Sequence, residues 1–306
     1  MITTKGFRDI IEIGRQRRPE IYNLFFDKPK PIVPRKLGYE IDERVDSNGN
    51  ILRKPNTREL DKIIDKIKKN DVKTIAVSLI NSYANSANEL AIKKYIHDKI
   101  PNIDICISCE VDNEYREYER TSTTVINAVL IPIVRDYIKE LTNIIKKYFD
   151  CAEFAIMKSD GGVSSSFYVI RLPISIIESG PAAGVIATRF IGQIIREKNL
   201  ISFDMGGTTA KSGTIIEGAP SIATEYEVGG KIHAGRIIKG SGYPVRYSFI
   251  DLAEISSGGG SIIWLDAAGA LKVGPISAGS DPGPACYARG GKKPTITDAH
   301  LILVVL

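Results

Sequence analysis

The sequence predicts an α/β fold, because short apolar runs alternate with amphipathic stretches in its first half. Strands are expected at residues 72–80 and 103–111, where apolar runs are bounded by polar residues, and helices at 57–70 and 87–100. Strands that alternate with helices form sheets that are at least partly parallel. After residue 155 glycines become dense and one clear helix remains, at 181–198.

Helical periodicity is clearest at residues 57–70 and 119–150. In the first helix Thr57 stands at the capping position, and one face carries Leu60, Ile63, Ile64 and Ile67. The second helix is the longest in the chain, and an apolar stripe runs along it from residue 125 to 145. Pro132 lies inside this stripe and is expected to kink the helix, because proline cannot donate the backbone hydrogen bond.

A β-hairpin is expected near the start of the chain. Residues 39–45 alternate polar and apolar side chains, as a half-buried strand does, and residues 51–52 begin a return strand. The five residues between them, Asp46-Ser47-Asn48-Gly49-Asn50, are of the types that form tight turns.

Composition excludes several classes of function. The chain has 306 residues, of which 43% are hydrophobic and 25% charged, which is typical of a globular protein. The net charge is +5, but lysines and acids are interleaved, so no nucleic-acid partner is expected. No run of 18 apolar residues indicates a membrane span, and the first residues lack the layout of a signal peptide. Four cysteines are few for this length, so a cytoplasmic location is expected.

Isolated cysteines and histidines give little support for metal or redox chemistry. Cys106 and Cys109 form a C-x-x-C pair, but no second pair or nearby histidine completes a zinc site. If both lie on a strand, they point to opposite faces, so we expect neither a metal nor an essential disulfide there. The remaining single residues are interpreted as packing or loop residues: Cys286, Trp264, His97, His233 and His300.

The sharpest motif lies at residues 200–211, where an apolar strand ends in Asp204-Met205-Gly206-Gly207-Thr208-Thr209-Ala210-Lys211. A strand–turn–strand hairpin is expected here, with the second strand at residues 213–216, and we expect it at the mouth of a cleft. On these residues alone, the alternative is a purely structural hairpin. The string is neither a Walker A loop nor the G-x-G-x-x-G fingerprint of a dinucleotide-binding fold.

Each residue type in this motif suits phosphate chemistry. Adjacent glycines let backbone amides approach a phosphate closely, and the Thr208 and Thr209 hydroxyls add donors. Asp204 can hold Mg²⁺ through water or orient an attacking water. Lys211 can contact a phosphate or an anionic substrate.

Three further loops share the same glycine-rich character. They are Ser159-Asp160-Gly161-Gly162-Val163, Glu178-Ser179-Gly180-Pro181-Ala182-Ala183-Gly184 and Ser256-Ser257-Gly258-Gly259-Gly260-Ser261. The second opens the helix at 181–198, and free amides at a helix start attract anions. Each loop alone is more often a turn than a site.

The Asp204 motif, the loop at residues 178–184 and further strings resemble the hydantoinase A/5-oxoprolinase family, which includes acetone and acetophenone carboxylase subunits. The other strings are Lys5-Gly6-Phe7-Arg8-Asp9 with Glu12-Ile13-Gly14-Arg15-Gln16, Arg116-Glu117-Tyr118-Glu119-Arg120-Thr121-Ser122-Thr123, the segment 258–266, Ser277-Ala278-Gly279-Ser280-Asp281-Pro282-Gly283-Pro284-Ala285-Cys286-Tyr287 and Thr295-Ile296-Thr297-Asp298-Ala299. They cover nearly the whole chain in order. Residues 225–243 resemble the hydantoinase- and carboxylase-like branch.

The resemblance implies an actin/sugar-kinase/Hsp70-like (ribonuclease H-like) ATPase superfold that binds ATP and Mg²⁺ in a cleft between two domains. It implies a division into an N-terminal region at 1–119 and a hydantoinase A domain at 120–306. Asp204 is then the catalytic residue and holds Mg²⁺ through water. The expected cofactor-binding residues are Gly206, Gly207, Thr208, Thr209, Lys211, Gly258, Gly259 and Gly260. Lys211 departs from family members that carry an acid at this position.

Three functions remain open on the sequence. The first is an ATP-dependent amidohydrolase subunit that opens a cyclic amide, a hydantoin or 5-oxoproline, through phosphorylation of the amide oxygen. The second is an ATP-dependent ketone carboxylase subunit of the acetone or acetophenone type. The third is a non-catalytic split or decayed fragment. For the enzymes, the resemblance implies a B-type hydantoinase subunit as partner.

Family members begin with an Asp-Gly-Gly phosphate loop upstream of the Lys5 string and continue beyond the Thr295 string. The chain is therefore expected to be incomplete at both ends, with an N-terminal piece that is encoded separately or lost. We expect the isolated chain to hydrolyse ATP negligibly, because one phosphate loop alone cannot surround the developing charge. Arg116 and Arg120 are interpreted either as residues that bridge domains or bind substrate, or as solvated charges at a helix start.

Overall fold

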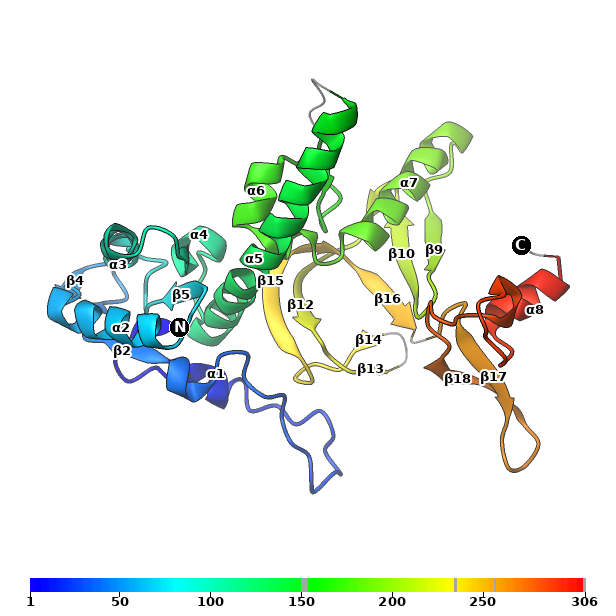
Figure 1. The fold of residues 1–306 in the computed structure, drawn as a ribbon, viewed down its shortest axis with the longest axis horizontal. Coiled ribbons are helices and arrows are strands. Elements are labelled where there is room, and N and C mark those ends of the chain that lie inside the picture. The colour runs from blue at the N-terminus through cyan, green and yellow to red at the C-terminus, as the bar shows by residue number, and fades with distance from the viewer. Residues whose placement is uncertain (150–153, 234–235, 256, 305–306) are drawn as a thin grey trace. The chain divides into compact units, whose positions relative to one another are not determined.

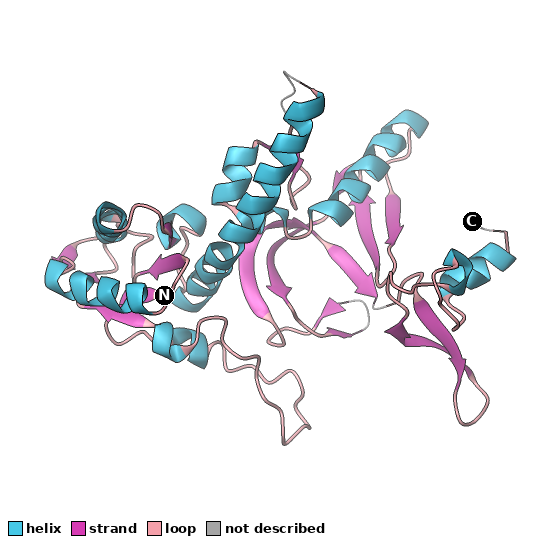
Figure 2. Cartoon of the chain, in the orientation of Figure 1, coloured by secondary structure: helices cyan, strands magenta, loops and turns pink. Residues whose placement is uncertain are grey.

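The computed structural model describes residues 1–149, 154–233, 236–255 and 257–304. The chain divides into two compact units (Figure 1). The first unit comprises Met1–Ser179, Thr224–Gly230 and Lys239–Phe249, and the second comprises Gly180–Ala223, Lys231–Ile238 and Ile250–Leu306. Helices dominate the first half of the chain and strands the second half (Figure 2).

A four-stranded parallel sheet forms the centre of the first unit. Its order is β2-β1-β5-β6, with β1 at Ile2–Thr4, β2 at Tyr39–Ile41, β5 at Thr74–Ser78 and β6 at Asp104–Ile107. All three pairings are parallel. The predicted α/β alternation with a parallel sheet is thereby confirmed.

Helices cover both faces of this sheet. Helices α2 (Thr57–Lys69) and α3 (Ala87–Lys99) pack with Ile75, Val77 and Ile107 in one buried cluster. Helix α5 (Glu117–Tyr148) packs with Ala76 and Cys106 on the opposite face. Because successive strand residues point to opposite faces, β5 contributes to both clusters.

The amphipathic face of α2 is the one that its sequence predicts. Leu60, Ile63, Ile64 and Ile67 are all buried. The predicted cap is wrong by one residue: Asn56 is the N-cap, and its side chain accepts a hydrogen bond from the amide of Arg58. In α3, by contrast, Ile92 and Ile96 are buried while Leu90 is exposed.

Two strand and helix predictions need correction. The strand expected at 103–111 ends at Ile107, and the chain then forms a one-turn helix, α4 (Ser108–Val111). In α5 the predicted stripe is buried mainly in its first half, where Val125, Ile126 and Ala128 face the core. Val129 and Ile133 of the predicted stripe are exposed, because they lie on a different face of α5 from the buried Ala128 and Ile131. Pro132 lies inside this 32-residue helix.

Shorter elements complete the first unit. The predicted hairpin is present as β3 (Arg44–Val45) and β4 (Ile51–Arg53), although residues 39–41 belong to the parallel sheet instead. Strands β12 (Ile222–Val228) and β15 (Tyr243–Ile250) pair, and Phe249 packs against Tyr226 and Tyr247. The remaining elements are α1 (Ile10–Ile13), η1 (Arg35–Leu37), β7 (Ile156–Met157), β8 (Val163–Ser164), α6 (Ser166–Arg171) and η2 (Pro173–Ile176).

In the second unit an antiparallel sheet packs against one helix. Strand β10 (Ala210–Ile216) pairs with β9 (Leu200–Met205), β11 (Ala219–Pro220) and β16 (Leu252–Ile255). Helix α7 (Ser179–Ile195) covers one face of this sheet. Its Val185 lies so close to Gly213 that a Cβ there would come within 2.5 Å of the valine Cγ2. Glycine at 213 therefore permits the close helix–sheet packing.

The C-terminal part of the second unit forms a hairpin and a short helix. Strand β17 (Ser261–Leu265) pairs with β18 (Leu271–Ser277), and η3 (Ala285–Tyr287) precedes α8 (Ile296–Ile302). A further small hairpin joins β13 (Ile232–His233) and β14 (Arg236–Ile237). Trp264 was expected in the core but is 44% exposed on the two-stranded hairpin, with its indole N–H donating to the carbonyl of Gly274. No helix in the described ranges combines the length and apolar character needed to cross a bilayer.

Candidate functional site

The Asp204–Lys211 motif forms the expected hairpin. Met205 pairs with Ala210 at the end of the β9–β10 ladder, and the amide of Gly206 donates to the carbonyl of Thr209 at 2.9 Å. Strand β10 begins at Ala210, three residues before its predicted start, so Lys211 lies within the strand. The strand–turn–strand arrangement is confirmed, while its place at the mouth of a cleft stays a prediction.

The triple glycine packs its backbone onto this turn. The amides of Gly259 and Gly260 donate to the carbonyls of Gly206 and Gly207 at 2.9 and 2.7 Å. A Cβ at Gly258 would lie 2.7 Å from both the amide nitrogen and the carbonyl carbon of Thr208. We call residues 206–209 together with 258–261 the glycine junction. Within it, glycine is required at 258 by the close approach of two backbones.

The backbone amides of the two loops therefore differ in whether they already have a hydrogen-bond acceptor. Those of the triple glycine are already used: Gly259 and Gly260 hold the turn, and Gly258 donates to the Ser261 hydroxyl at 2.9 Å. Among the described residues, no acceptor is found for the amides of Gly207 and Thr208. The turn at residues 206–209 thus keeps the amides of Gly207 and Thr208 available as donors to a ligand. The triple-glycine loop holds this turn in position.

Gly207 has no structural need to be glycine. Its φ angle lies outside the left-handed region, and a Cβ there would meet nothing within 4 Å. Gly206 also lacks a left-handed φ, and the nearest contact of its Cβ would be an ordinary 3.6 Å. Both residues are exposed. Missing side chains on an exposed turn leave room for a ligand to approach the backbone closely.

Neighbouring segments brace the junction. Thr297 and Ala278 donate backbone hydrogen bonds to the carbonyls of Gly259 and Gly260. Asp298 is the N3 residue of the capping box of α8 and accepts from the amide and hydroxyl of the N-cap, Thr295. It also accepts from the Cys286 amide at 2.7 Å. Burial disfavours the charged carboxylate of Asp298. The hydrogen bonds from these donors outweigh burial and hold the pKa of Asp298 below its ordinary value. The Thr-Asp-Ala string is therefore a brace for the loop around Cys286.

Below the turn, three charged residues form a row across three strands. Lys211 on β10 is directly opposite Asp204 on β9 and Glu254 on β16. Its ammonium lies 3.6 Å from the Glu254 carboxylate, and these two side chains are only 16% and 17% exposed. Asp204 is exposed. Glu254 carries no local sequence signal, because cross-strand neighbours are set by strand register.

Asp204 is the one carboxylate predicted to hold Mg²⁺ through water. Among the described residues, no group of three or more histidine, cysteine or carboxylate side chains stands ready for a metal. A Mg²⁺ ion bound with nucleotide commonly keeps several waters and takes one or two carboxylates together with phosphate oxygens. Exposed Asp204 beside the turn is compatible with such binding.

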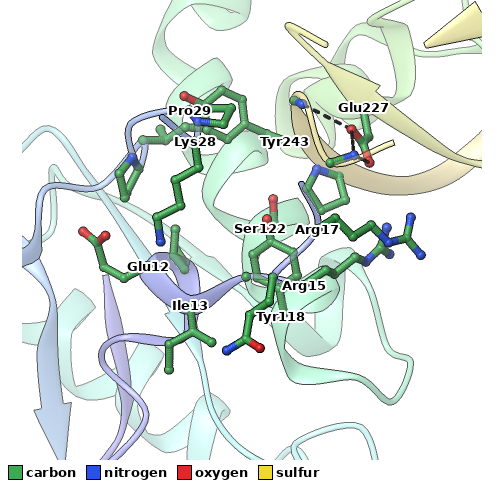
Figure 3. Close-up of a pocket in the computed structure, with 18 of the residues that line it drawn as sticks. Glu12, Ile13, Arg15, Arg17, Lys28, Pro29, Tyr118, Ser122, Glu227 and Tyr243 are labelled. Carbon is green, nitrogen blue, oxygen red and sulfur yellow. Dashed lines mark hydrogen bonds between the residues drawn. The ribbon is translucent and has the colours of Figure 1, made fainter. Parts of the chain in front are cut away.

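A small cavity of about 70 Å³ lies in the first unit (Figure 3). Arg15 lies in its wall and binds two carboxylates: Nε donates to Glu119 at 2.6 Å, and Nη1 donates to Glu225 at 2.8 Å. Glu227 accepts hydrogen bonds from the amides of Gly240 and Gly242, drawn as dashed lines in Figure 3. Arg15 of the Glu12 string is thereby held in the wall by Glu119 of the Arg116 string and by Glu225, the first residue of the segment 225–243.

The two arginines of the Arg116 string differ sharply. Arg120 is 1% exposed, and its guanidinium donates to the carbonyls of Leu79 and Glu114. It therefore stabilises the turn that leads into α5. Arg116 is exposed and lines a larger cavity of about 820 Å³ in the same unit.

The C-x-x-C pair has no shared face. Cys106 lies on β6 and accepts a hydrogen bond from Asn127, whereas Cys109 lies in α4. The assignment of both to a strand was wrong, because the strand ends between them. Burial raises the pKa of each thiol to about 12, and both thiols are free. Cys286 is also free and is exposed rather than packed, while Cys151 lies outside the described residues.

Comparison with known proteins finds two family models that match this chain. The model of the hydantoinase/oxoprolinase family matches residues 120–306, and that of the hydantoinase/oxoprolinase N-terminal region matches residues 1–100. An uncharacterized protein of Methanocaldococcus jannaschii is 54% identical over 99% of this chain and 45% of its own length. The caprolactamase subunit alpha of Pseudomonas jessenii is 30% identical over 99% of this chain and 42% of its own length.

Solved structures agree. The crystal structure of ATP-dependent caprolactamase from Pseudomonas jessenii matches with a TM-score of 0.78 at 28% identity, over all of this chain and 43% of that one. A nucleotide-free acetone carboxylase has the same fold, with a TM-score of 0.77 at 24% identity, over all of this chain and 43% of that one. The chain spans less than half the length of these relatives. It belongs to the hydantoinase/oxoprolinase family.

Proposed function

We propose that this chain is part of an ATP-dependent amidohydrolase that opens a cyclic amide, a hydantoin or 5-oxoproline, with the turn at residues 206–209 as one phosphate-binding loop. The observation that carries this proposal is the state of Gly207. Its amide has no acceptor among the described residues, and its missing side chain has no internal explanation. Backbone amides arranged in such a turn bind phosphate oxygens.

The proposed chemistry uses the same turn. The γ-phosphoryl group of ATP would pass to the amide oxygen with release of ADP. Water would then add to the activated carbon, the C–N bond would break as the nitrogen takes up a proton, and a second water would release the phosphate. The amides of Gly207 and Thr208, with the hydroxyls of Thr208 and Thr209, would hold the transferred group. Fixed donors of this kind act mainly by stabilising charge that develops in the transition state. Asp204 would orient Mg²⁺-bound water or the attacking water, and Lys211 would offset phosphate charge.

Family membership supports a wider assignment as a proposal. We propose the actin/sugar-kinase/Hsp70-like superfold, a division at 1–119 and 120–306, a cytoplasmic location and a B-type hydantoinase subunit as partner. The relatives named caprolactamase subunit alpha and 5-oxoprolinase support the amidohydrolase. The acetophenone carboxylase gamma subunit, 30% identical over 99% of this chain, supports a ketone carboxylase as the second candidate.

Nucleotide binding to a Gly207→Ala variant tests the proposal. A methyl group at Gly207 clashes with nothing in the protein but occupies the space that a phosphate would need. We expect ATP affinity to fall at least tenfold while the thermal unfolding midpoint is unchanged. Gly184→Ala is the control for ATP affinity, because a Cβ there also meets nothing within 4 Å. Its thermal midpoint should rise, since Gly184 lies inside helix α7 and Ala favours a helix interior over Gly. Equal ATP affinity of Gly207→Ala and wild type would remove the turn from the nucleotide site.

Product analysis separates the two enzyme candidates. With the protein as the cell makes it and its B-type partner, a hydrolase releases ADP and phosphate on addition of 5-oxoproline or hydantoin, independently of bicarbonate. A carboxylase requires bicarbonate together with a ketone. In either case Asp204→Asn should lower kcat by about 10²-fold or more while ATP still binds, if Asp204 acts in the chemical step. If neither substrate class induces ATP consumption, both assignments are contradicted.

A further inference from the structure

The cavity of about 820 Å³ in the first unit is lined by sequence motifs that have no part in the proposed phosphate loop. Its walls come from the segment that leads into α5, from the Ser-Asp-Gly-Gly loop, and from β12 and β15. The lining residues on which the argument depends are Arg116, Lys158, Asp160, Tyr168, Arg246 and Tyr247. A cavity of this size is in the range that binds small molecules.

Two of the cations in this cavity are held in place by carboxylates. Arg246 donates to Asp112 at 2.7 Å, and both side chains are mostly buried. Lys158 lies 2.8 Å from Asp160, and its ammonium lies over the ring of Tyr168. Both cations are therefore fixed parts of the wall, and their charges are largely balanced.

Arg116 is different. Its guanidinium lies 5.5 Å from the ring centre of Tyr115, and no carboxylate of the described residues pairs with it. Stacking on an aromatic ring orients the flat guanidinium without using its five N–H donors. An exposed arginine with unused donors beside a cavity is suited to bind a carboxylate in bidentate fashion.

The backbone at Arg116 strengthens this assignment. Its φ is +71°, a left-handed conformation that costs a residue with a side chain free energy and favours glycine. Arg246 holds the strained turn by donating to the carbonyls of Tyr115 and Arg116 at 2.7 and 3.4 Å. Strained residues that persist in this way cluster at binding sites. The fold alone gives no reason to prefer arginine over glycine here.

A neutral hydroxyl also lines the cavity. The hydroxyl of Tyr247 donates to Asp160 at 3.5 Å, and burial raises the pKa of Tyr247 above its ordinary value. The tyrosine therefore stays protonated and adds no charge to the wall. With the rings of Tyr115 and Tyr168, the cavity offers flat apolar surface between its polar groups.

We propose that this cavity binds a small carboxylate-bearing molecule, and that Arg116 receives the carboxylate. This site rests on the proposed function only in the choice of ligand, a cyclic amide that carries a carboxylate rather than a neutral lactam. Arg116 is then the residue that selects anionic over neutral substrates. Nucleotide binding at the glycine junction is a separate event in the second unit.

Calorimetry without nucleotide tests the site. The probes are 5-oxoproline and 2-pyrrolidinone, which share the lactam ring and differ in the carboxylate. We expect the protein to bind 5-oxoproline at least tenfold more tightly than 2-pyrrolidinone. Arg116→Gly and Arg116→Gln should each weaken 5-oxoproline binding at least tenfold and leave 2-pyrrolidinone binding unchanged.

The glycine variant separates a binding role from a structural one. Since glycine suits the left-handed φ, Arg116→Gly should leave the thermal midpoint unchanged or raise it. Arg289→Gln is the matched control, because Arg289 is also exposed and lies 5.9 Å from the ring centre of Tyr287. It should keep wild-type binding.

Four outcomes overturn the proposal. They are no binding of 5-oxoproline by wild-type protein, no difference between the two probes, unchanged 5-oxoproline binding in Arg116→Gly, and an equal loss in Arg289→Gln. None of these outcomes bears on ATP binding, which the Gly207→Ala measurement tests independently.

Discussion

Gly258 lies directly against the backbone of Thr208, so that a methyl group at position 258 would come within 2.7 Å of the threonine amide nitrogen and carbonyl carbon. These residues are fifty positions apart in the sequence. Their contact makes the two glycine loops one rigid unit, because Gly259 and Gly260 also donate to the carbonyls of the turn. The second loop thus positions the first.

The first prediction concerns this contact. Gly258→Ala should destabilise the protein by about 1–3 kcal/mol, since the clash is with backbone and neither strand end can move easily. Gly207→Ala, which meets open space, should change stability by less than about 0.5 kcal/mol. Urea denaturation of both variants measures the difference. Equal stability of the two variants would show that the loops are not rigidly joined.

The sequence predicted local structure better than contacts between distant segments. The buried face of α2 follows from the spacing of Leu60, Ile63, Ile64 and Ile67, because helical periodicity is a local property. The position of Cys109 was missed, since a one-turn helix such as α4 has too few residues to show a period. Trp264 was placed in the core because its neighbours are apolar, yet its hairpin has only two strands.

The candidate site shows the same limit. The turn at residues 206–209 was predicted from its glycines and its flanking strands, and the pairing of Met205 with Ala210 bears this out. The bracing role of the triple glycine could not be predicted, because a close backbone approach between distant loops leaves no local pattern. Glu254 was missed for a similar reason: strand register alone brings it beside Lys211.

The second prediction concerns Glu225. Hydrogen bonds from the Arg15 guanidinium hold the pKa of this carboxyl below its ordinary value. A carboxyl with a lowered folded-state pKa contributes stability above its unfolded pKa, near 4.3, and this contribution is lost as the pH falls through the folded-state pKa. Glu225→Gln should therefore cost about 1–2 kcal/mol at pH 7 and less at pH 3.

Urea denaturation across this pH range measures the effect. Asp42→Asn is the control, since Asp42 and its partner Arg53 form a more exposed ion pair. Exposed pairs contribute little, so the control should lose less stability than Glu225→Gln at pH 7. A loss for Glu225→Gln that is independent of pH would mean that packing, not charge, accounts for it.

The third prediction has the opposite sign. Glu43 is 2% exposed and accepts hydrogen bonds from Thr4 and Asn88, and burial raises the pKa of its carboxyl. A carboxyl with a raised folded-state pKa contributes stability below the unfolded pKa, near 4.3, and this is lost as the pH rises through the folded-state pKa. Glutamine is neutral at every pH.

Glu43→Gln should therefore gain stability relative to wild type as the pH rises from 4 to 7. Parallel denaturation of Glu43→Gln and Glu225→Gln should give trends of opposite direction. If Glu43→Gln instead falls further below wild type at pH 7 than at pH 4, the buried carboxylate is stabilised in its charged form.

The last prediction concerns the row of Asp204, Lys211 and Glu254. Lys211→Met removes the cation that stands between two carboxylates on neighbouring strands, so it should destabilise the second unit by about 1 kcal/mol. Glu254→Gln removes the carboxylate that pairs with Lys211. Combining the two changes should recover part of the lost stability, because the double variant no longer leaves Glu254 without its partner.

ATP affinity then separates two roles for Lys211. If its ammonium also offsets phosphate charge at the turn, Lys211→Met and the double variant should both bind ATP several-fold more weakly than wild type. Glu254→Gln alone should keep its affinity, since the ammonium remains. Calorimetric titration of all three variants gives the comparison. If the double variant recovers ATP affinity together with its stability, Lys211 acts only by holding the strands together. A lysine that contacts phosphate could not be replaced by relieving repulsion elsewhere.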